Sequence, residues 1–121
     1  MKRNKKAPRY TRAQAIADGL LIDVTDTARS AGLNVLVAIT PALWADILAV
    51  PPLHRAHQDV LDRLSAVLLQ ARWAMIDVAD AWGSYEVAMP VGDRETYQVT
   101  MLIGPDENGN QCLMLMRPEE K

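Results

Sequence analysis

Two histidines, His54 and His57, stand three residues apart, a spacing that brings two imidazoles to one side of a helix, where they could share a metal ion. A zinc site needs a third ligand and usually a fourth. Asp59 and Cys112 are the obvious donors, and neither stands at a diagnostic spacing. We interpret the histidines as polar residues of a first helical turn, with a metal site as the alternative. We expect no metal, no cofactor and no catalytic residue.

The aspartates are numerous enough to suggest paired carboxylates or a magnesium site. Asp23 and Asp26 flank a predicted helix start, where capping explains them. Asp62, Asp77 and Asp80 are assigned to one acidic face of a predicted long helix. A row of carboxylates can mimic nucleic-acid phosphates and occupy a basic channel on another protein. These three residues are therefore candidates for partner binding, and catalysis by paired carboxylates is the alternative.

Positive charge is concentrated at the N-terminus. The first 12 residues hold six of the 13 Lys and Arg residues and no acid, so seven basic residues face 15 acidic ones in the rest. Such an arm could contact phosphates or an acidic protein, or it could be a solubilising tail. Its basic residues are Lys2, Arg3, Lys5, Lys6, Arg9 and Arg12.

Cap and breaker residues divide the N-terminal half into short helices. Thr11 and Gln14 form a capping box for the first helix. Thr25 is predicted to cap the second. Thr40-Pro41 begins a third helix, which ends before Pro51-Pro52.

The stretch Leu53–Trp82 is predicted to be one long helix, on which the other elements pack. Its apolar residues recur at spacings of three and four, so they share one side. We expect this stripe to lie on a sheet. Its members are Val60, Leu64, Val67, Leu68, Ala71, Met75, Val78 and Trp82.

A narrower apolar line on the same helix lies roughly opposite the stripe. We expect the helix at 41–49 to cover it, with a dimer or partner surface as the alternative. Asp59 and Arg63 are placed on the wet side of the helix, in the favourable i,i+4 order. The narrow line consists of Leu69, Trp73 and Ile76.

Beyond Gly83 the apolar period becomes two-fold, which is typical of strands. The turn at 106–110 contains Asn-Gly, a strong hairpin signal. Residues 111–116 are apolar on both faces, which indicates a central or doubly covered strand. The earlier runs Leu20–Ile22 and Leu33–Ile39 fit short strands or buried extended segments.

The order of elements predicts an α+β fold. In it, N-terminal short helices and one long central helix pack on a C-terminal three-stranded antiparallel meander. We expect a disordered basic tail over residues 1–9, a single α+β domain over 10–117 and a polar C-terminal tail over 118–121. One cysteine, no secretory leader and no apolar run long enough to span a bilayer predict a cytoplasmic protein without a membrane partner.

The segment Tyr10–Val24, with Ala31–Leu33, Val37–Thr40, Trp44–Asp46 and the sheet segment Tyr97–Pro105, carries a likeness to known sequences. It resembles an uncharacterised family of small bacterial proteins carried on plasmids, integrative elements and phages. The family offers no catalytic residues to carry over. The resemblance implies genomic company, because mobile elements often encode small inhibitors of host defence, including anti-CRISPR proteins.

These observations predict a non-enzymatic protein-binding factor encoded by a mobile element. Its partner would be a host protein complex, such as a CRISPR–Cas effector, inhibited by steric or acidic-surface occlusion through Asp62, Asp77 and Asp80. The alternative is a nucleic-acid-associated accessory factor of a plasmid or integrative element that uses the basic tail. Either could be a monomer or a homodimer.

Overall fold

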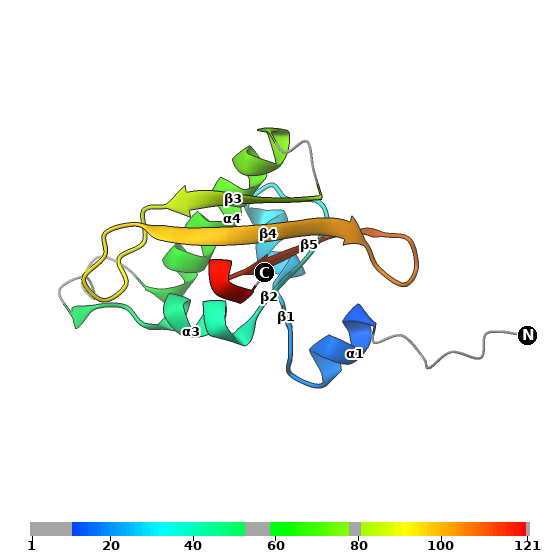
Figure 1. Ribbon diagram of the computed structural model, residues 1–121, viewed down its shortest axis with the longest axis horizontal. Helices are drawn as coiled ribbons and strands as arrows, with labels where there is room; N and C mark the ends of the chain where they lie inside the picture. The colour runs from blue at the N-terminus through cyan, green and yellow to red at the C-terminus, as the bar shows by residue number, and fades with distance from the viewer. Residues whose placement is uncertain (1–10, 53–58, 78–80, 121) are drawn as a thin grey trace, which may run out of the picture.

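A computed structural model describes residues 11–52, 59–77 and 81–120, which form an α+β fold (Figure 1). The helices are α1 (Arg12–Ala17), α2 (Thr25–Ser30), α3 (Pro41–Leu48) and α4 (Val60–Asp77), and a 3-10 turn, η2, spans Pro118–Glu120. The strands are β1 (Ile22–Asp23), β2 (Leu36–Ile39), β3 (Trp82–Val87), β4 (Tyr97–Pro105) and β5 (Gln111–Met116). None of the described helices is long and apolar enough to cross a membrane.

Two predicted helix starts are confirmed by their hydrogen bonds. The Thr11 hydroxyl accepts a hydrogen bond from the Gln14 amide at 3.0 Å, and the Gln14 side chain accepts one from the Thr11 amide at 2.7 Å. Thr40 caps α3 by accepting from the Leu43 amide at 3.3 Å, and Pro41 lies in the first turn. Both caps satisfy amides that a helix start would otherwise leave without partners.

Within the described residues, five strands form one mixed sheet in the order β1-β2-β5-β4-β3. The antiparallel meander β3-β4-β5 is present as predicted. The predicted limit of three strands is wrong, because β2 pairs with β5 in parallel and β1 pairs with β2 antiparallel. The parallel register runs from Leu36 opposite Cys112 to Ile39 opposite Leu115. β5 is therefore central, with Leu113 and Leu115 buried on one face and Cys112 and Met114 half-buried on the other, which fits its run of apolar residues.

The long helix is shorter at its C-terminal end than predicted. The structure describes α4 over Val60–Asp77, and residues 53–58 and 78–80 of the predicted helix lie outside the described residues. Trp82 is the first residue of β3, opposite Leu102, so the predicted end at Trp82 is wrong. Its spacing of four from Val78 fits a helix, but an aromatic side chain also suits a strand.

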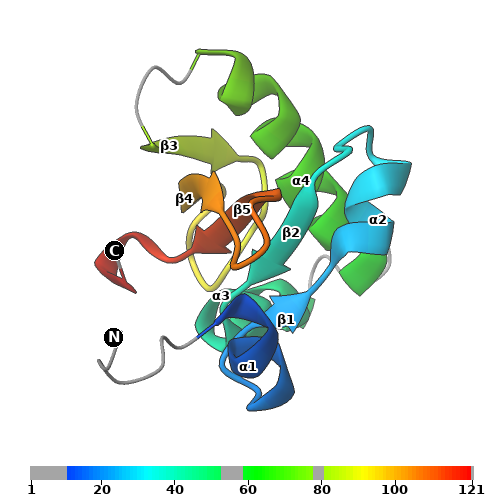
Figure 2. The same ribbon diagram turned by 90° about the vertical axis from the view of Figure 1, so that its right-hand side faces the viewer.

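Helices α2, α3 and α4 pack on one face of the sheet, and α1 lies on the other (Figure 2). Val67 and Leu68 of α4 are fully buried in one core with Val99, Met101 and Leu115 of the sheet. The main apolar stripe of α4 therefore lies on the sheet, as predicted. We refer to the opposite side of the sheet, which carries α1, as the open face.

The second apolar line of α4 is exposed. Leu69 is 42% and Trp73 is 56% exposed, so the prediction that the helix at 41–49 covers them is wrong. The side chain of Ile76 lies outside the described residues. The predicted alternative, a surface for a second copy or a partner, fits this exposure.

α3 instead meets α4 through Arg63, which is 1% exposed, so its predicted position on the wet side is wrong. Nε donates to the Ile47 carbonyl at 2.9 Å, Nη1 to the Pro90 carbonyl at 2.7 Å and Nη2 to the Asp46 carbonyl at 2.9 Å. One guanidinium on α4 thus holds the C-terminal end of α3 and the segment after β3. Sequence spacing could not reveal this, because the acceptors are backbone atoms.

Candidate functional site

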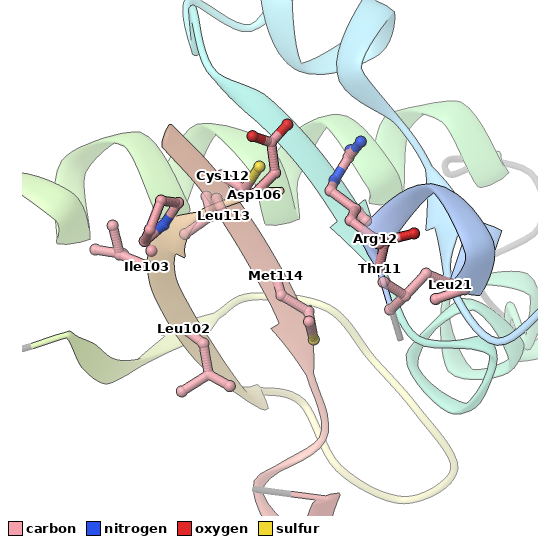
Figure 3. Close-up of a pocket in the computed structure, with 13 residues that line it drawn as sticks. Thr11, Arg12, Leu21, Leu102, Ile103, Asp106, Cys112, Leu113 and Met114 are labelled. Carbon is pink, nitrogen blue, oxygen red and sulfur yellow. The ribbon is translucent and has the colours of Figure 1, made fainter. Parts of the chain in front are cut away.

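The open face contains a groove with a cavity volume of about 330 Å³ between α1 and the β4–β5 hairpin (Figure 3). Leu21, Ala38, Leu102 and Met114 give it an apolar lining, and polar side chains contribute at its ends. Two of its lining residues were candidates in the sequence, Arg12 as part of the basic arm and Cys112 as a possible metal ligand, but the groove itself was not predicted. It is assembled from α1 and Leu21, from Ala38 of β2 and from the β4–β5 hairpin, which are distant in the chain.

The floor of the groove continues as a row across the whole sheet. Direct cross-strand pairing places Asp23 opposite Ala38, Ala38 opposite Met114, Met114 opposite Leu102 and Leu102 opposite Trp82. Paired residues share a face, so all five side chains lie on the open face. Trp82 ends the row at 46% exposure. The open face therefore offers an apolar track from the groove to the edge strand.

α1 forms one wall because its own apolar side is anchored to the sheet. Ala15 and Leu21 are buried in a small cluster with Ala38, and Ile16 and Met114 pack against it. This cluster is separate from the main core on the other side of the sheet. The wall is thus held by few contacts, and the capping box at Thr11 fixes the start of the helix beside the groove.

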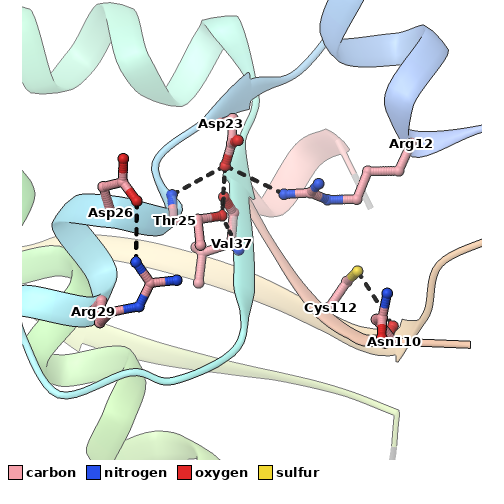
Figure 4. Close-up of polar contacts among 8 residues, drawn as sticks. All are labelled: Arg12, Asp23, Thr25, Asp26, Arg29, Val37, Asn110 and Cys112. Atoms are coloured by element: carbon pink, nitrogen blue, oxygen red, sulfur yellow. Dashed lines mark hydrogen bonds and ion pairs between the residues drawn. The ribbon is translucent and has the colours of Figure 1, made fainter. Parts of the chain in front are cut away.

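A polar network joins α1 to β1 (Figure 4). Arg12 Nη2 lies 3.4 Å from Asp23 Oδ1, and the same oxygen accepts hydrogen bonds from the amide and hydroxyl of Thr25. The predicted cap at Thr25 is wrong, because Val24 takes the cap position and Thr25 is the first residue of α2. The Thr25 hydroxyl instead accepts from the Val37 amide at 3.1 Å. Partial burial would raise the pKa of Asp23, but the Thr25 hydrogen bonds and the Arg12 charge outweigh it and lower that pKa. Asp23 therefore ties α1 to the start of α2, whereas Asp26 makes an exposed ion pair with Arg29.

The opposite rim is the predicted hairpin at 106–110, which is confirmed. Asp106 Oδ1 accepts from the amides of Asn108 and Asn110, each at 2.8 Å, and Gly109 has a φ of +81°. Only glycine adopts that backbone conformation without strain. Desolvation would raise the pKa of Asp106, but the hydrogen bonds from Asn110 and Asn108, helped by the Arg12 charge, together outweigh it and lower that pKa, so the carboxylate stays charged. With exposed Glu107 beside it, this rim is acidic.

Cys112 lies half-buried in the groove, near Asp106 and across from Arg12 (Figure 3). Burial raises the pKa of its thiol, the acidic rim adds to this, and Arg12 opposes it. The nucleophile and metal ligand is the thiolate, so a raised pKa argues against both roles at neutral pH.

We expect Cys112 to react slowly with a disulfide reagent at pH 7.5, and its rate to rise at higher pH than that of a small free thiol. The pKa is raised, so the reactive thiolate forms only as the pH passes a value above the ordinary range. Stopped-flow absorbance across pH 7–10, with Cys112→Ser as the blank, measures this. An inflection below that of the free thiol would contradict it.

α4 presents a second exposed surface on the helix-covered side of the molecule. Its outer face consists of Leu61, Asp62, Ser65, Leu69, Arg72 and Trp73, of which Leu61 is 60% exposed. The Arg72 guanidinium carbon lies 5.6 Å from the centre of the Trp73 ring, a cation–π distance. A Cβ at Gly32 would come within 3.1 Å of the Arg72 guanidinium, so this glycine leaves room for it.

The structure describes only some of the predicted partner-binding residues. Asp62 is exposed, and its amide and carboxylate exchange hydrogen bonds with Asp59 at 2.8 and 3.4 Å, which caps α4. The side chain of Asp77 lies outside the described residues, so the predicted acidic face stays a prediction of which the structure describes Asp62 alone. Among the described residues no group of three His, Cys, Asp or Glu side chains could hold a metal ion. The predicted residues wholly outside the described ranges are His54, His57, Asp80, Lys2, Arg3, Lys5, Lys6 and Arg9.

A further polar cluster joins α3 to the sheet and to η2. Arg117 donates to both oxygens of Asp46, from Nε at 2.8 Å and from Nη2 at 2.9 Å, and the Tyr97 hydroxyl donates to the same carboxylate. Burial would raise the pKa of Asp46, but these donors outweigh it and lower the pKa. Burial and the nearby carboxylate raise the pKa of Tyr97. The three groups satisfy one another, as in a structural tie.

Residues 118–120 of the predicted polar tail form η2, which is tied to α3. Glu120 Oε1 accepts from the Thr40 hydroxyl at 2.7 Å and from the Arg117 amide at 2.9 Å. This end of the chain therefore closes over the sheet beside the cluster at Asp46.

One sequence pattern indicated that the sheet has a second apolar face. The alternation of 111–116 placed apolar residues on both faces of β5, and a strand with two apolar faces implies something to bury on each side. α1 covers only part of the second face. Comparison with known proteins gives no further assignment: no protein-family model, curated protein or solved structure matches the chain.

Proposed function

We propose that the protein is a non-enzymatic binding factor that takes an apolar side chain of a partner protein into the groove on its open face. The observation that supports this is the apolar row Ala38–Met114–Leu102–Trp82, which runs out from under α1 to an exposed tryptophan. Protein interfaces are commonly anchored by a few apolar or aromatic residues that fill such pockets. The half-exposed groove suits an anchor of this kind.

The charges around the groove favour a basic partner. Asp106 and Glu107 form its hairpin rim, while Arg12 at the other wall is already paired with Asp23. A partner with a cationic surface would gain attraction at the hairpin and lose little elsewhere, since surface charge mainly governs encounter and orientation. The acidic surplus of the chain beyond its first 12 residues works in the same direction.

The resemblance to proteins of plasmids, integrative elements and phages provides a setting for this activity. A host defence complex with a basic nucleic-acid channel, such as a CRISPR–Cas effector, has the surface that an acidic binding factor would occlude. In this proposal the groove and its hairpin rim supply the contact, and the three aspartates proposed for α4 are not required.

The native cysteine allows the groove to be blocked without a mutation. Cys112 is the single cysteine of the chain, so N-ethylmaleimide modifies one position, inside the groove. We expect alkylation at pH 8.5 to abolish capture of the partner from host lysate, measured by quantitative mass spectrometry. The Cys112→Ser protein should capture the same partner with and without reagent.

A second variant fills the groove by substitution. Met114→Arg should lose the same partner, because a charge then lies where the anchor would pack. Leu48→Asp is the matched control, since Leu48 is 49% exposed on α3 and lies outside the groove. Circular dichroism confirms folding of each protein. If the alkylated and Met114→Arg proteins capture the same proteins as the wild type, the groove is not the binding site.

A further inference from the structure

The outer face of α4 has a pattern that is independent of the groove and lies on the other side of the sheet (Figure 2). Leu61, Leu69 and Trp73 are 60%, 42% and 56% exposed, while Leu64, Val67 and Leu68 on the inner side are at most 5% exposed. An amphipathic helix at a surface normally turns polar residues outward. Three large apolar side chains on the outward side indicate a surface that is covered in the assembled protein.

The order of residues on this face identifies what covers it. Consider two antiparallel helices related by a two-fold axis. A residue of one helix lies at the same height as a residue of the other when their two numbers add up to twice the number of the residue at the axis. With the axis at the level of Val67, Leu61 lies level with Trp73 of the other copy and Ser65 lies level with Leu69. The same register brings Asp62 level with Arg72. All six residues of the outer face are thereby matched.

We propose that α4 packs antiparallel against α4 of a second copy of this chain, centred at Val67. Packing at the usual interaxial distance of 8–10 Å puts the Cβ atoms of Asp62 and Arg72 of the second copy about 6 Å apart, within reach of an ion pair. Each dimer has two such pairs. Ser65 is a small residue at the height of Leu69 of the second copy, so the leucine side chain has room to pack against it.

The charges of Asp62 and Arg72 favour the antiparallel pairing over a parallel one. No carboxylate among the described residues pairs with Arg72, whose guanidinium lies over the Trp73 ring. Within the described part of the chain, the Asp62 carboxylate accepts one hydrogen bond, from the Asp59 amide at 3.4 Å, which leaves it able to bind a guanidinium. A parallel pairing of the same faces would set Asp62 level with Asp62 and Arg72 level with Arg72. Like charges at one level destabilise a helix pair, so the antiparallel arrangement is preferred.

The dimer leaves both grooves accessible, because α4 and the groove lie on opposite faces of the sheet. A dimer would therefore present two equivalent grooves. Two linked sites can hold a repeated or oligomeric partner far more tightly than one site, because the second contact forms at high effective concentration.

A charge exchange on the full chain tests the register. By analytical ultracentrifugation, the wild type should sediment as a dimer of the 13.4 kDa chain. Asp62→Arg and Arg72→Asp should each weaken the dimer about tenfold or more, since each sets like charges level with one another. Mixing these two variants should restore dimers, because the mixed pair again matches opposite charges. The double variant Asp62→Arg/Arg72→Asp should dimerise alone.

The controls separate the surfaces. Trp73→Glu should give a monomer, whereas Gln70→Arg, a charge on α4 outside the outer face, should remain dimeric. Met114→Arg should also remain dimeric, so failure of the groove proposal would not affect this result. Circular dichroism confirms that each variant is folded. A wild type that is monomeric at 100 µM, dimers that persist in Trp73→Glu, or variants whose mixture does not recover would each overturn the proposal.

Discussion

Replacing Arg63 with methionine is expected to destabilise the protein by at least about 1.5–3 kcal/mol, the value of a hydrogen bond that involves a charged group. Arg63 is 1% exposed and donates to the carbonyls of Ile47, Pro90 and Asp46. Methionine fills much of the same volume but donates no hydrogen bond, so three carbonyls lose a donor. The Asp46 carbonyl keeps the Ala49 amide at 3.2 Å, whereas a buried carbonyl left without any partner costs about 1–3 kcal/mol.

Urea unfolding followed by tryptophan fluorescence measures the effect of Arg63→Met. Arg94→Met is the matched control, because Arg94 is exposed and its loss should change the free energy of unfolding by no more than about 0.5 kcal/mol. Arg63→Lys keeps the charge but lacks the planar fork that reaches three acceptors, so it should also be destabilised. If Arg63→Lys were as stable as the wild type, charge alone would account for the effect.

Asp46→Asn is expected to cost about 1.5–3 kcal/mol at pH 7, the value of hydrogen bonds to a charged group. The substitution removes the charge that Arg117 and the Tyr97 hydroxyl share. Because the pKa of Asp46 is lowered in the folded protein, its stabilising effect is present above the unfolded value near 3.8. That effect is lost as the pH falls through the lower folded value.

The acid dependence separates this ion pair from a packing defect. The difference between wild type and Asp46→Asn should be largest at neutral pH and should shrink below pH 4 as the wild-type carboxyl is protonated. Chemical unfolding at pH 7 and at pH 2.5 measures both values. Asp26→Asn is the control, since the Asp26 side chain is fully exposed and its loss should be nearly neutral. A difference that is the same at both pH values would contradict the assignment.

The parts of the fold that the sequence predicts correctly are those determined by residues close together in the chain. The capping box at Thr11, the Thr40-Pro41 start of α3 and the Asn-Gly hairpin are each determined by neighbours within five residues. The main stripe of α4 was also predictable, because burial against a sheet requires a helical period. These elements gave the α+β class and the antiparallel meander.

The remaining features depend on contacts between distant parts of the chain. The pairing of β2 with β5 leaves no turn signal, because parallel strands are not joined by a hairpin. Arg63 has the spacing of a surface residue, and its burial follows from backbone acceptors on two other segments. The groove likewise unites α1, β2, β4 and β5, so no single stretch of sequence carries its pattern.

The late position of β5 in the sequence affects how the protein folds during its synthesis. Ile39 pairs with Leu115, 76 positions later in the chain, and the sheet lacks its middle until that segment exists. At a synthesis rate of about 5–20 residues per second, β2 waits on the order of 4–15 seconds for its neighbour. Throughout that interval the inner faces of α3 and α4 have no complete sheet to pack against. Ribosome-associated holdase chaperones can therefore bind the nascent chain during this interval. A stall in translation lengthens the period in which nascent chains can aggregate.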